Sequence, residues 1–133
     1  MAAKYDMDAL EKCVKNKAVF LSGPMAGIEN NNAAAFAEAH ALMIQAGAAE
    51  VYDPVQRWFN NGTEERTHDS WMRESIRVLA GDSGWPSRPR WDVMVQLDGW
   101  NVSQGALTED TVARACMVAV VELREFEIGE ESR

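Results

Sequence analysis

Glu109 is the residue whose type and position most clearly suggest chemistry. It ends the segment 99–109, Gly-Trp-Asn-Val-Ser-Gln-Gly-Ala-Leu-Thr-Glu, in which Gly105 and Ala106 allow a helix to begin close to a ligand. Glu109 then falls about one turn into that helix, where the helix dipole favours the ionised carboxylate. An ionised carboxylate suits a nucleophile. The plainer interpretation is a solvated glutamate on the helix face.

A second candidate site is the turn Ser22-Gly-Pro-Met-Ala-Gly27, which follows a strand-like run and precedes a helix. Its glycines let backbone N–H groups approach an anion, and the start of the helix adds a favourable dipole. The turn matches neither the dinucleotide-binding pattern nor the Walker pattern. An ordinary tight turn is the alternative. The candidate ligand contacts are Ser22, Gly23, Pro24, Met25 and Gly27.

Three further side chains could contribute to such a site. Glu74 would serve as a general acid if burial raised its pKa, and it is otherwise a surface partner of Arg73 or Arg77. Asp53 ends a short strand-like run, and the indole of Trp100 could stack on a planar base.

The elements that must position these residues alternate along the chain. Apolar runs predict strands, and helical spacing of apolar residues predicts helices between them. Strands are expected at 17–22, 50–53, 91–97 and 117–123, and helices at 33–46, 71–80 and 106–116. This order predicts an α/β fold of three layers, α/β/α, with a four- to five-stranded parallel sheet of the flavodoxin or Rossmann kind. Ligands of such sheets bind beyond the carboxyl ends of the strands, which selects the loops 22–32, 53–70 and 98–105.

The whole chain, 1–133, is expected to form a single domain with its core at about 17–123. Residues 81–90, rich in Gly and Pro, form an insertion, and residues 56–70 are expected to be a loop. The acidic tail 124–133 is expected to fray.

Composition narrows the classes of partner. The formal net charge of −8 disfavours binding of a nucleic acid polymer, because an acidic surface repels the phosphate backbone. No apolar run is long enough to span a bilayer, so no membrane association is expected. Cys13 and Cys116 match no metal spacing and indicate free thiols in a reducing cytoplasm.

The chain resembles the nucleoside 2-deoxyribosyltransferase-like superfamily, above all its small bacterial and phage members. The resemblance depends on two motifs, Val19-Phe-Leu-Ser-Gly-Pro-Met-Ala-Gly27 and Asp98-Gly-Trp-Asn-Val-Ser-Gln-Gly-Ala-Leu-Thr-Glu109. It also includes Val51-Tyr-Asp-Pro54 and spans about residues 17–123. The pair of motifs is fairly specific, whereas either motif alone is not.

The resemblance implies cleavage or exchange of the N-glycosidic bond of a 2-deoxynucleoside or its 5′-monophosphate. Glu109 would attack C1′ of the sugar to give a covalent deoxyribosyl intermediate, and Glu74 would assist departure of the base. Ser103 matches the serine with which the nucleotide-cleaving members meet the phosphate, which favours a nucleotide ligand. No cofactor and no metal is implied. A homodimer or larger homo-oligomer is expected.

Two other interpretations stay open. The resembled enzymes carry a tyrosine hydroxyl where this chain has Phe20, which favours a nucleotide-binding or sensing module without catalysis. In the third interpretation, Glu109 and Glu74 are surface groups and the protein is an interaction scaffold.

Overall fold

The fold is built on one parallel sheet. We describe it from a computed structural model, which covers residues 4–25, 28, 32–59, 68–84 and 87–128. The strands are β1 (Ala18–Ser22), β2 (Glu50–Tyr52), β3 (Val93–Gln96) and β4 (Ala119–Glu122), in the order β2-β1-β3-β4. Every neighbouring pair is parallel. The predicted α/β class and the four-stranded sheet are confirmed.

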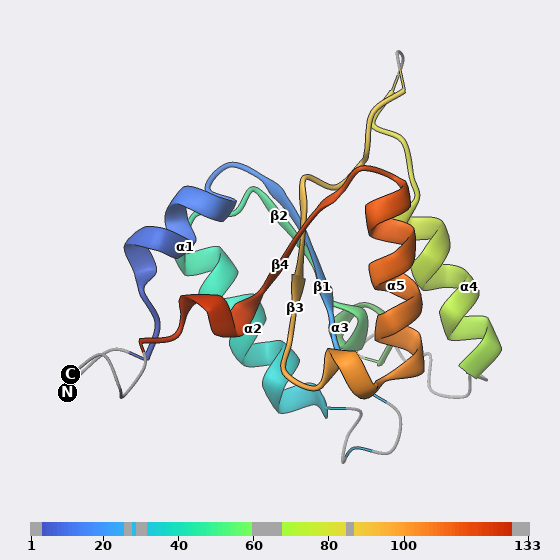
Figure 1. Ribbon diagram of the computed structural model, residues 1–133, viewed down its shortest axis with the longest axis horizontal. Coiled ribbons are helices and arrows are strands. Elements are labelled where there is room, and N and C mark those ends of the chain that lie inside the picture. Colours follow the sequence, from blue (N-terminus) through green and yellow to red (C-terminus); the bar gives the residue numbers. More distant parts are fainter. Residues whose placement is uncertain (1–3, 26–27, 29–31, 60–67, 85–86, 129–133) are drawn as a thin grey trace.

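Helices cover both faces of this sheet and complete three layers (Figure 1). On one face lie α1 (Met7–Val14) and α2 (Ala33–Gln45), and on the other lie α4 (His68–Leu79) and α5 (Gln104–Ala115). In the described part of the chain, no helix has the length and apolar character needed to cross a bilayer.

The alternation of side chains along β1 decides which residues face which helices. Val19 and Leu21 pack into the core under α1 and α2, whereas Phe20 packs into the core under α4 and α5. Because successive side chains of a strand point to opposite faces, Ser22 lies on the same face as Phe20. Burial of both faces explains why the strands read as continuous apolar runs. The last residue of β1 therefore directs a hydroxyl toward α5.

The region between β2 and α4 differs from the prediction. Residues 56–70 were expected to be a loop, but they include most of α3 (Pro54–Phe59) and the first turn of α4, which begins at His68 rather than at Trp71. Asp53 caps α3, because its Oδ1 accepts from the backbone N–H groups of Val55 (3.0 Å) and Gln56 (3.2 Å). An aspartate followed by proline is a helix-start signal, because proline suits the first helical position.

The chain ends also differ from the prediction. Residues 124–128 do not fray, because η3 (Leu123–Phe126) is a 3-10 helix that packs near α1. The N–H of Asp6 donates to the carbonyl of Phe126 (2.7 Å), and the N–H of Ile128 donates to the carbonyl of Lys4 (2.8 Å). The rest of the predicted acidic tail, 129–133, lies outside the described residues.

The described parts of the predicted insertion, residues 81–84 and 87–90, form the base of an arm at the end of the sheet opposite the start of α5 (Figure 1). Residues 85–86 lie outside the described residues. An antiparallel bridge between Asp82 and Pro89 closes the base of the arm. Arg90 lies over the ring of Trp91, 4.4 Å from the ring centroid, and forms an ion pair with Glu50. The base of the arm is thereby fixed to the sheet.

Candidate functional site

A pocket of about 460 Å³ lies at the carboxyl ends of the strands, where ligands of parallel α/β sheets bind. Its walls come from the turn after β1, the first residue of α3, residues 71–75 of α4 and the start of α5. We call it the Glu109 pocket. The residues that line it are Gly23, Pro24, Met25, Ile28, Pro54, Trp71, Met72, Ser75, Val102, Ser103, Gln104, Gly105, Ala106 and Glu109.

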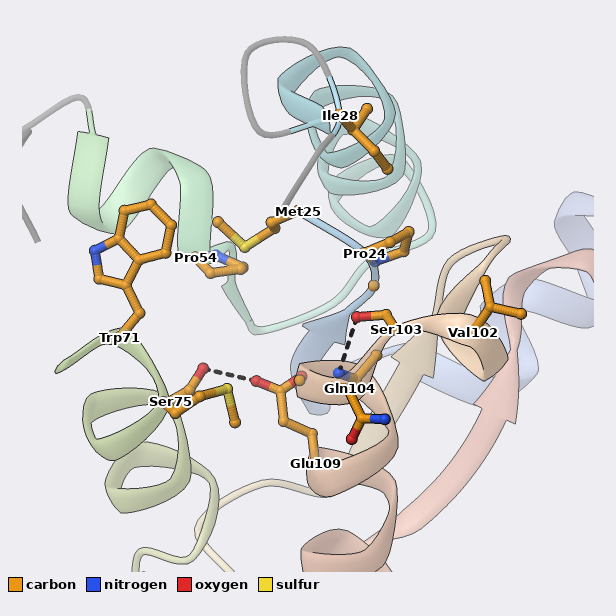
Figure 2. A pocket seen from close by; sticks show the side chains of 14 residues that line it. Pro24, Met25, Ile28, Pro54, Trp71, Ser75, Val102, Ser103, Gln104 and Glu109 are labelled. Atoms are coloured by element: carbon orange, nitrogen blue, oxygen red, sulfur yellow. Dashed lines mark hydrogen bonds between the residues drawn. The ribbon is translucent and has the colours of Figure 1, made fainter. Parts of the chain in front are cut away.

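The carboxyl group of Glu109 is buried in the wall of this pocket and is held by two hydroxyls. Ser22 Oγ donates to Oε1 (2.5 Å), and Ser75 Oγ donates to Oε2 (2.7 Å). Figure 2 shows the contact with Ser75. Both distances fall in the range of charge-assisted O–H···O⁻ bonds. Since the donors come from β1 and α4, three separate elements fix the carboxyl group.

Helix α5 places Glu109 here through its start and its spacing. Ser103 caps the helix, with its Oγ accepting from the N–H of Ala106 (3.3 Å). Ala106, Glu109 and Ala113 are the buried residues of the helix, and their spacing of three and four residues puts them on one face. The small side chains at the helix start leave space in front of the carboxyl group.

Burial raises the pKa of Glu109 above the ordinary value of 4.5. Transfer out of water disfavours the charged form and is the largest cause, whereas the hydroxyls of Ser22 and Ser75 favour the charged form and lower the pKa. Burial therefore opposes the ionisation that the helix dipole is expected to favour. Ionisation occurs at a higher pH than for an exposed glutamate.

The carboxyl group keeps acceptor capacity for a ligand. A carboxylate oxygen has two lone pairs, and each oxygen of Glu109 uses one on a serine. Around it the lining is mainly apolar and includes Met25, Pro54 and Trp71 (Figure 2). An apolar pocket with a few polar groups is typical of a site for a small organic molecule.

Most of the predicted contacts after β1 and at α5 are brought together. The pocket is lined by Gly23, Pro24, Met25, Ser103 and Gly105, and Ser22 joins it through its bond to Glu109. Gly27 lies outside the described residues.

Glu74 is not brought to the pocket, which corrects its expected role as a general acid. Its Oε1 accepts from Nη2 (2.7 Å) and Nε (3.0 Å) of Arg77, three residues along α4. The physical reason is helical rotation: Trp71 and Ser75, four residues apart, share the face of α4 that lines the pocket, and Glu74 is turned away from it. The position of Glu74 agrees with the alternative interpretation, in which its carboxyl group pairs with Arg77.

Asp53 and Trp100, both expected at the ligand, also lie elsewhere. Besides capping α3, Asp53 bonds through Oδ2 to Nδ1 of His40 (3.1 Å). Trp100 donates through Nε1 to Glu122 (3.1 Å) at the end of β4. Neither residue is among those that line the Glu109 pocket.

Sequence reasoning missed Ser75 and Trp71 as site residues. A signal was present, because the expected helix 71–80 carries both on its apolar side, and a hydroxyl on an apolar face needs a partner. The partner, Glu109, is 34 residues away in the sequence. Among the described residues, no group of three or more His, Cys, Asp or Glu could hold a metal ion.

A family model described as Domain of unknown function (DUF4406) matches residues 17–122. The chain is a DUF4406 protein. The matched part of DUF4406 contains all four strands and every described residue that lines the Glu109 pocket, whereas α1 and η3 lie outside it. No curated protein and no solved structure matches the DUF4406 chain.

Proposed function

We propose that this DUF4406 protein cleaves or exchanges the N-glycosidic bond of a 2-deoxynucleoside or its 5′-monophosphate, with Glu109 as nucleophile. The observation that carries the proposal is a buried carboxyl group, fixed by Ser22 and Ser75, in the wall of a pocket of nucleoside size. The resemblance of the two flanking motifs to the nucleoside 2-deoxyribosyltransferase-like superfamily supports the same chemistry.

The reaction has two steps. An oxygen of ionised Glu109 bonds to C1′ of the sugar while the C1′–N bond breaks, and the electron pair of that bond leaves with the base. The base takes a proton from solvent. In the second step, water or another base attacks C1′, the ester bond to Glu109 breaks, and the carboxylate is restored. The attacking water or base loses a proton to solvent, which balances the proton that the departing base took up in the first step. This is the double displacement of a retaining glycosidase, with nitrogen as the leaving atom.

Glu109 is the one carboxyl among the described residues that line the pocket. In the proposed reaction, solvent rather than Glu74 therefore protonates the departing base, because the carboxyl group of Glu74 accepts a hydrogen bond from Arg77. Ser103 has a separate role. Its oxygen accepts from the N–H of Ala106, so its own O–H is available to donate to the 5′-oxygen or phosphate of the substrate.

Release of free base by Glu109→Gln and Glu109→Ala tests the proposal. The unmodified protein is expected to release base from at least one common deoxynucleoside or deoxynucleoside monophosphate, and both variants are expected to release none. Glu74→Gln is the matched control and should keep full activity, since Glu74 lies outside the pocket lining. Base release by Glu109→Ala at the unmodified rate would remove Glu109 from the mechanism.

A nucleotide-binding module without catalysis is the second candidate function. Phe20, which occupies the place of the enzymes' tyrosine, is fully buried and stacks on Tyr52 with ring centroids 4.7 Å apart. It has no hydroxyl for Glu109. Calorimetric binding of a deoxynucleotide that is recovered intact after long incubation would favour this function over cleavage.

We also propose that the protein acts in the cytoplasm as a homodimer or larger homo-oligomer. The resemblance to the nucleoside 2-deoxyribosyltransferase-like superfamily supports this proposal. Apolar residues that are exposed at the mouth of the Glu109 pocket also support an oligomer. Val102 is 84% exposed and Ile28 is 40% exposed, and both line the pocket. Light scattering of the purified protein would determine its mass in solution, and a monomer would contradict the proposal.

A further inference from the structure

A second pocket, of about 650 Å³, lies between α3, β2 and α4. None of its lining residues also lines the Glu109 pocket. Three arginines from separate segments line it: Arg57 from α3, Arg77 from α4 and Arg90 from the end of the 81–90 arm. We call it the arginine pocket.

The arginine pocket stands out in an acidic protein with a formal net charge of −8. Three arginines line it together with two acids, Glu50 and Asp53, and Arg77 also pairs with Glu74, which is outside the lining. In the Glu109 pocket the one charged residue is an acid, and a further pocket near the chain ends has Lys4 against three acids. The arginine pocket therefore concentrates guanidinium groups in one place despite the negative charge of the whole molecule.

The two acids of the arginine pocket do not compete equally for the arginines. Asp53 is buried and already accepts from two backbone N–H groups and contacts His40. Glu50 is exposed and pairs with Arg90. Arg77 likewise pairs with Glu74 at the surface, with 68% of its side chain exposed. Such exposed ion pairs contribute little to stability, so a bound anion can replace them.

Arginine is suited to phosphate because its planar guanidinium donates two parallel hydrogen bonds to two oxygens. The guanidinium of Arg90 is oriented by the ring of Trp91 beneath it, at 4.4 Å from the centroid. An adjoining pocket of about 520 Å³ shares Glu50, Arg90 and Trp91 with the arginine pocket and adds Arg88 and Asp92. Arg88 therefore supplies a fourth guanidinium group next to the arginine pocket, for a ligand with more than one anionic group.

We propose that the arginine pocket binds a small phosphorylated molecule that carries more than one anionic group, such as a pyrophosphate compound. The site is separate from the Glu109 pocket and does not depend on the function proposed for Glu109.

Isothermal titration with pyrophosphate and with inorganic phosphate, at constant ionic strength set with chloride, tests the proposal. Pyrophosphate is expected to give saturable binding and to bind more tightly than inorganic phosphate. The double variant R57A/R77A should lose at least about tenfold in affinity, because two charge-assisted contacts are removed. R57K/R77K keeps the positive charges but not the planar guanidinium groups. Its affinity for pyrophosphate should therefore lie between that of the unmodified protein and that of R57A/R77A.

Two further variants sharpen the result. Arg114→Ala is the matched control, since Arg114 is also an exposed arginine in an ion pair within one helix, and it lines neither pocket. It should leave pyrophosphate affinity unchanged. Glu50→Gln should increase affinity, because it removes the acid that competes for Arg90. Thermal unfolding of each variant verifies that it is folded.

The proposal is overturned if the unmodified protein gives no saturable binding, or if R57A/R77A binds pyrophosphate as tightly as the unmodified protein does. It is also overturned if Ser103→Ala weakens binding while R57A/R77A does not, because the anion would then occupy the Glu109 pocket.

Discussion

The pKa of Glu109 results from two opposing causes at the scale of a single residue. Burial favours the protonated form, and hydrogen bonds from Ser22 and Ser75 favour the carboxylate. The proposed reaction requires an ionised nucleophile, so in that reaction the serines would be positioning residues that maintain the carboxylate form of Glu109. Both the stability of the fold and the proposed activity then depend on pH through this one group.

Glu109→Gln is expected to change how stability depends on pH. As pH rises above 4.5, the unfolded chain ionises this carboxyl first, whereas the folded chain keeps its proton because burial raises the pKa. The free energy of unfolding of the unmodified protein therefore falls until the folded carboxyl also ionises. The variant lacks this loss, so its stability relative to the unmodified protein should increase with pH in that window. Urea unfolding at a series of pH values measures the difference, and a difference that is constant with pH would contradict the burial argument.

Ser75→Ala is expected to raise the pKa of Glu109 further, because it removes a donor to the carboxylate. The rising limb of the pH profile of base release should therefore move to higher pH. Ser75→Thr keeps a hydroxyl and should restore the original profile. An unmoved profile in Ser75→Ala would show that this hydroxyl does not act on the reactive group.

Helix α5 carries the site at the scale of an element. Its cap, its small residues at the start and its buried face together direct Glu109 into the pocket. Because Ser103 both caps the helix and lines the pocket, one side chain links the stability of α5 to the proposed ligand site.

Ser103→Ala is expected to lower the free energy of unfolding by about 1 kcal/mol, the usual effect of losing an N-cap. Ser103→Asn supplies a replacement cap and should recover most of that stability. Urea unfolding checks both variants, and amide hydrogen exchange at Gln104 to Ala106 locates the effect. Equal stability of Ser103→Ala and the unmodified protein would indicate that the cap contributes nothing.

At the scale of the whole molecule, α1 and η3 complete the hydrophobic core, although both lie outside the residues that the family model matches. Leu10 and Val14 of α1 are fully buried against the sheet, and η3 packs beside α1 through Leu123 and Phe126. Residues 17–122 contain the whole described pocket, so the ends stabilise the domain rather than form the site.

Ending the chain at Glu122 is therefore expected to destabilise the protein while leaving the residues of the pocket in place. Loss of the buried side chain of Leu123 and the half-buried side chain of Phe126 should lower the free energy of unfolding by about 3 kcal/mol. A chain that ends at Ile128 is the matched control, because it retains the contacts of Asp6 and Lys4 with the C-terminal segment. Urea unfolding compares the three forms, and equal stability of the shortest form would contradict a structural role for η3.

Much of the fold could be predicted because its signals are local. Continuous apolar runs indicated strands buried on both faces, and their alternation with helices indicated a parallel sheet. α3 was missed although the Asp53–Pro54 start signal was present, because the mostly polar composition of residues 56–70 is typical of a loop. The order of the C-terminal segment was missed because it depends on pairing with Lys4 and Asp6, more than a hundred residues earlier in the chain.

The sequence by itself determined that Glu109 lies about one turn into a helix and that Ser22 ends a buried strand, because helix spacing and apolar runs are set by neighbouring residues. The burial of Glu109 and the cap of its helix came from the tertiary structure. Only the tertiary structure decided which groups meet there. Ser22 is 87 residues from Glu109, and Ser75 rather than Glu74 faces the pocket because of how α4 is rotated against α5. Strand order and helix rotation are fixed by packing of the whole core, and the same packing removes water from Glu109 and so sets the direction of its pKa.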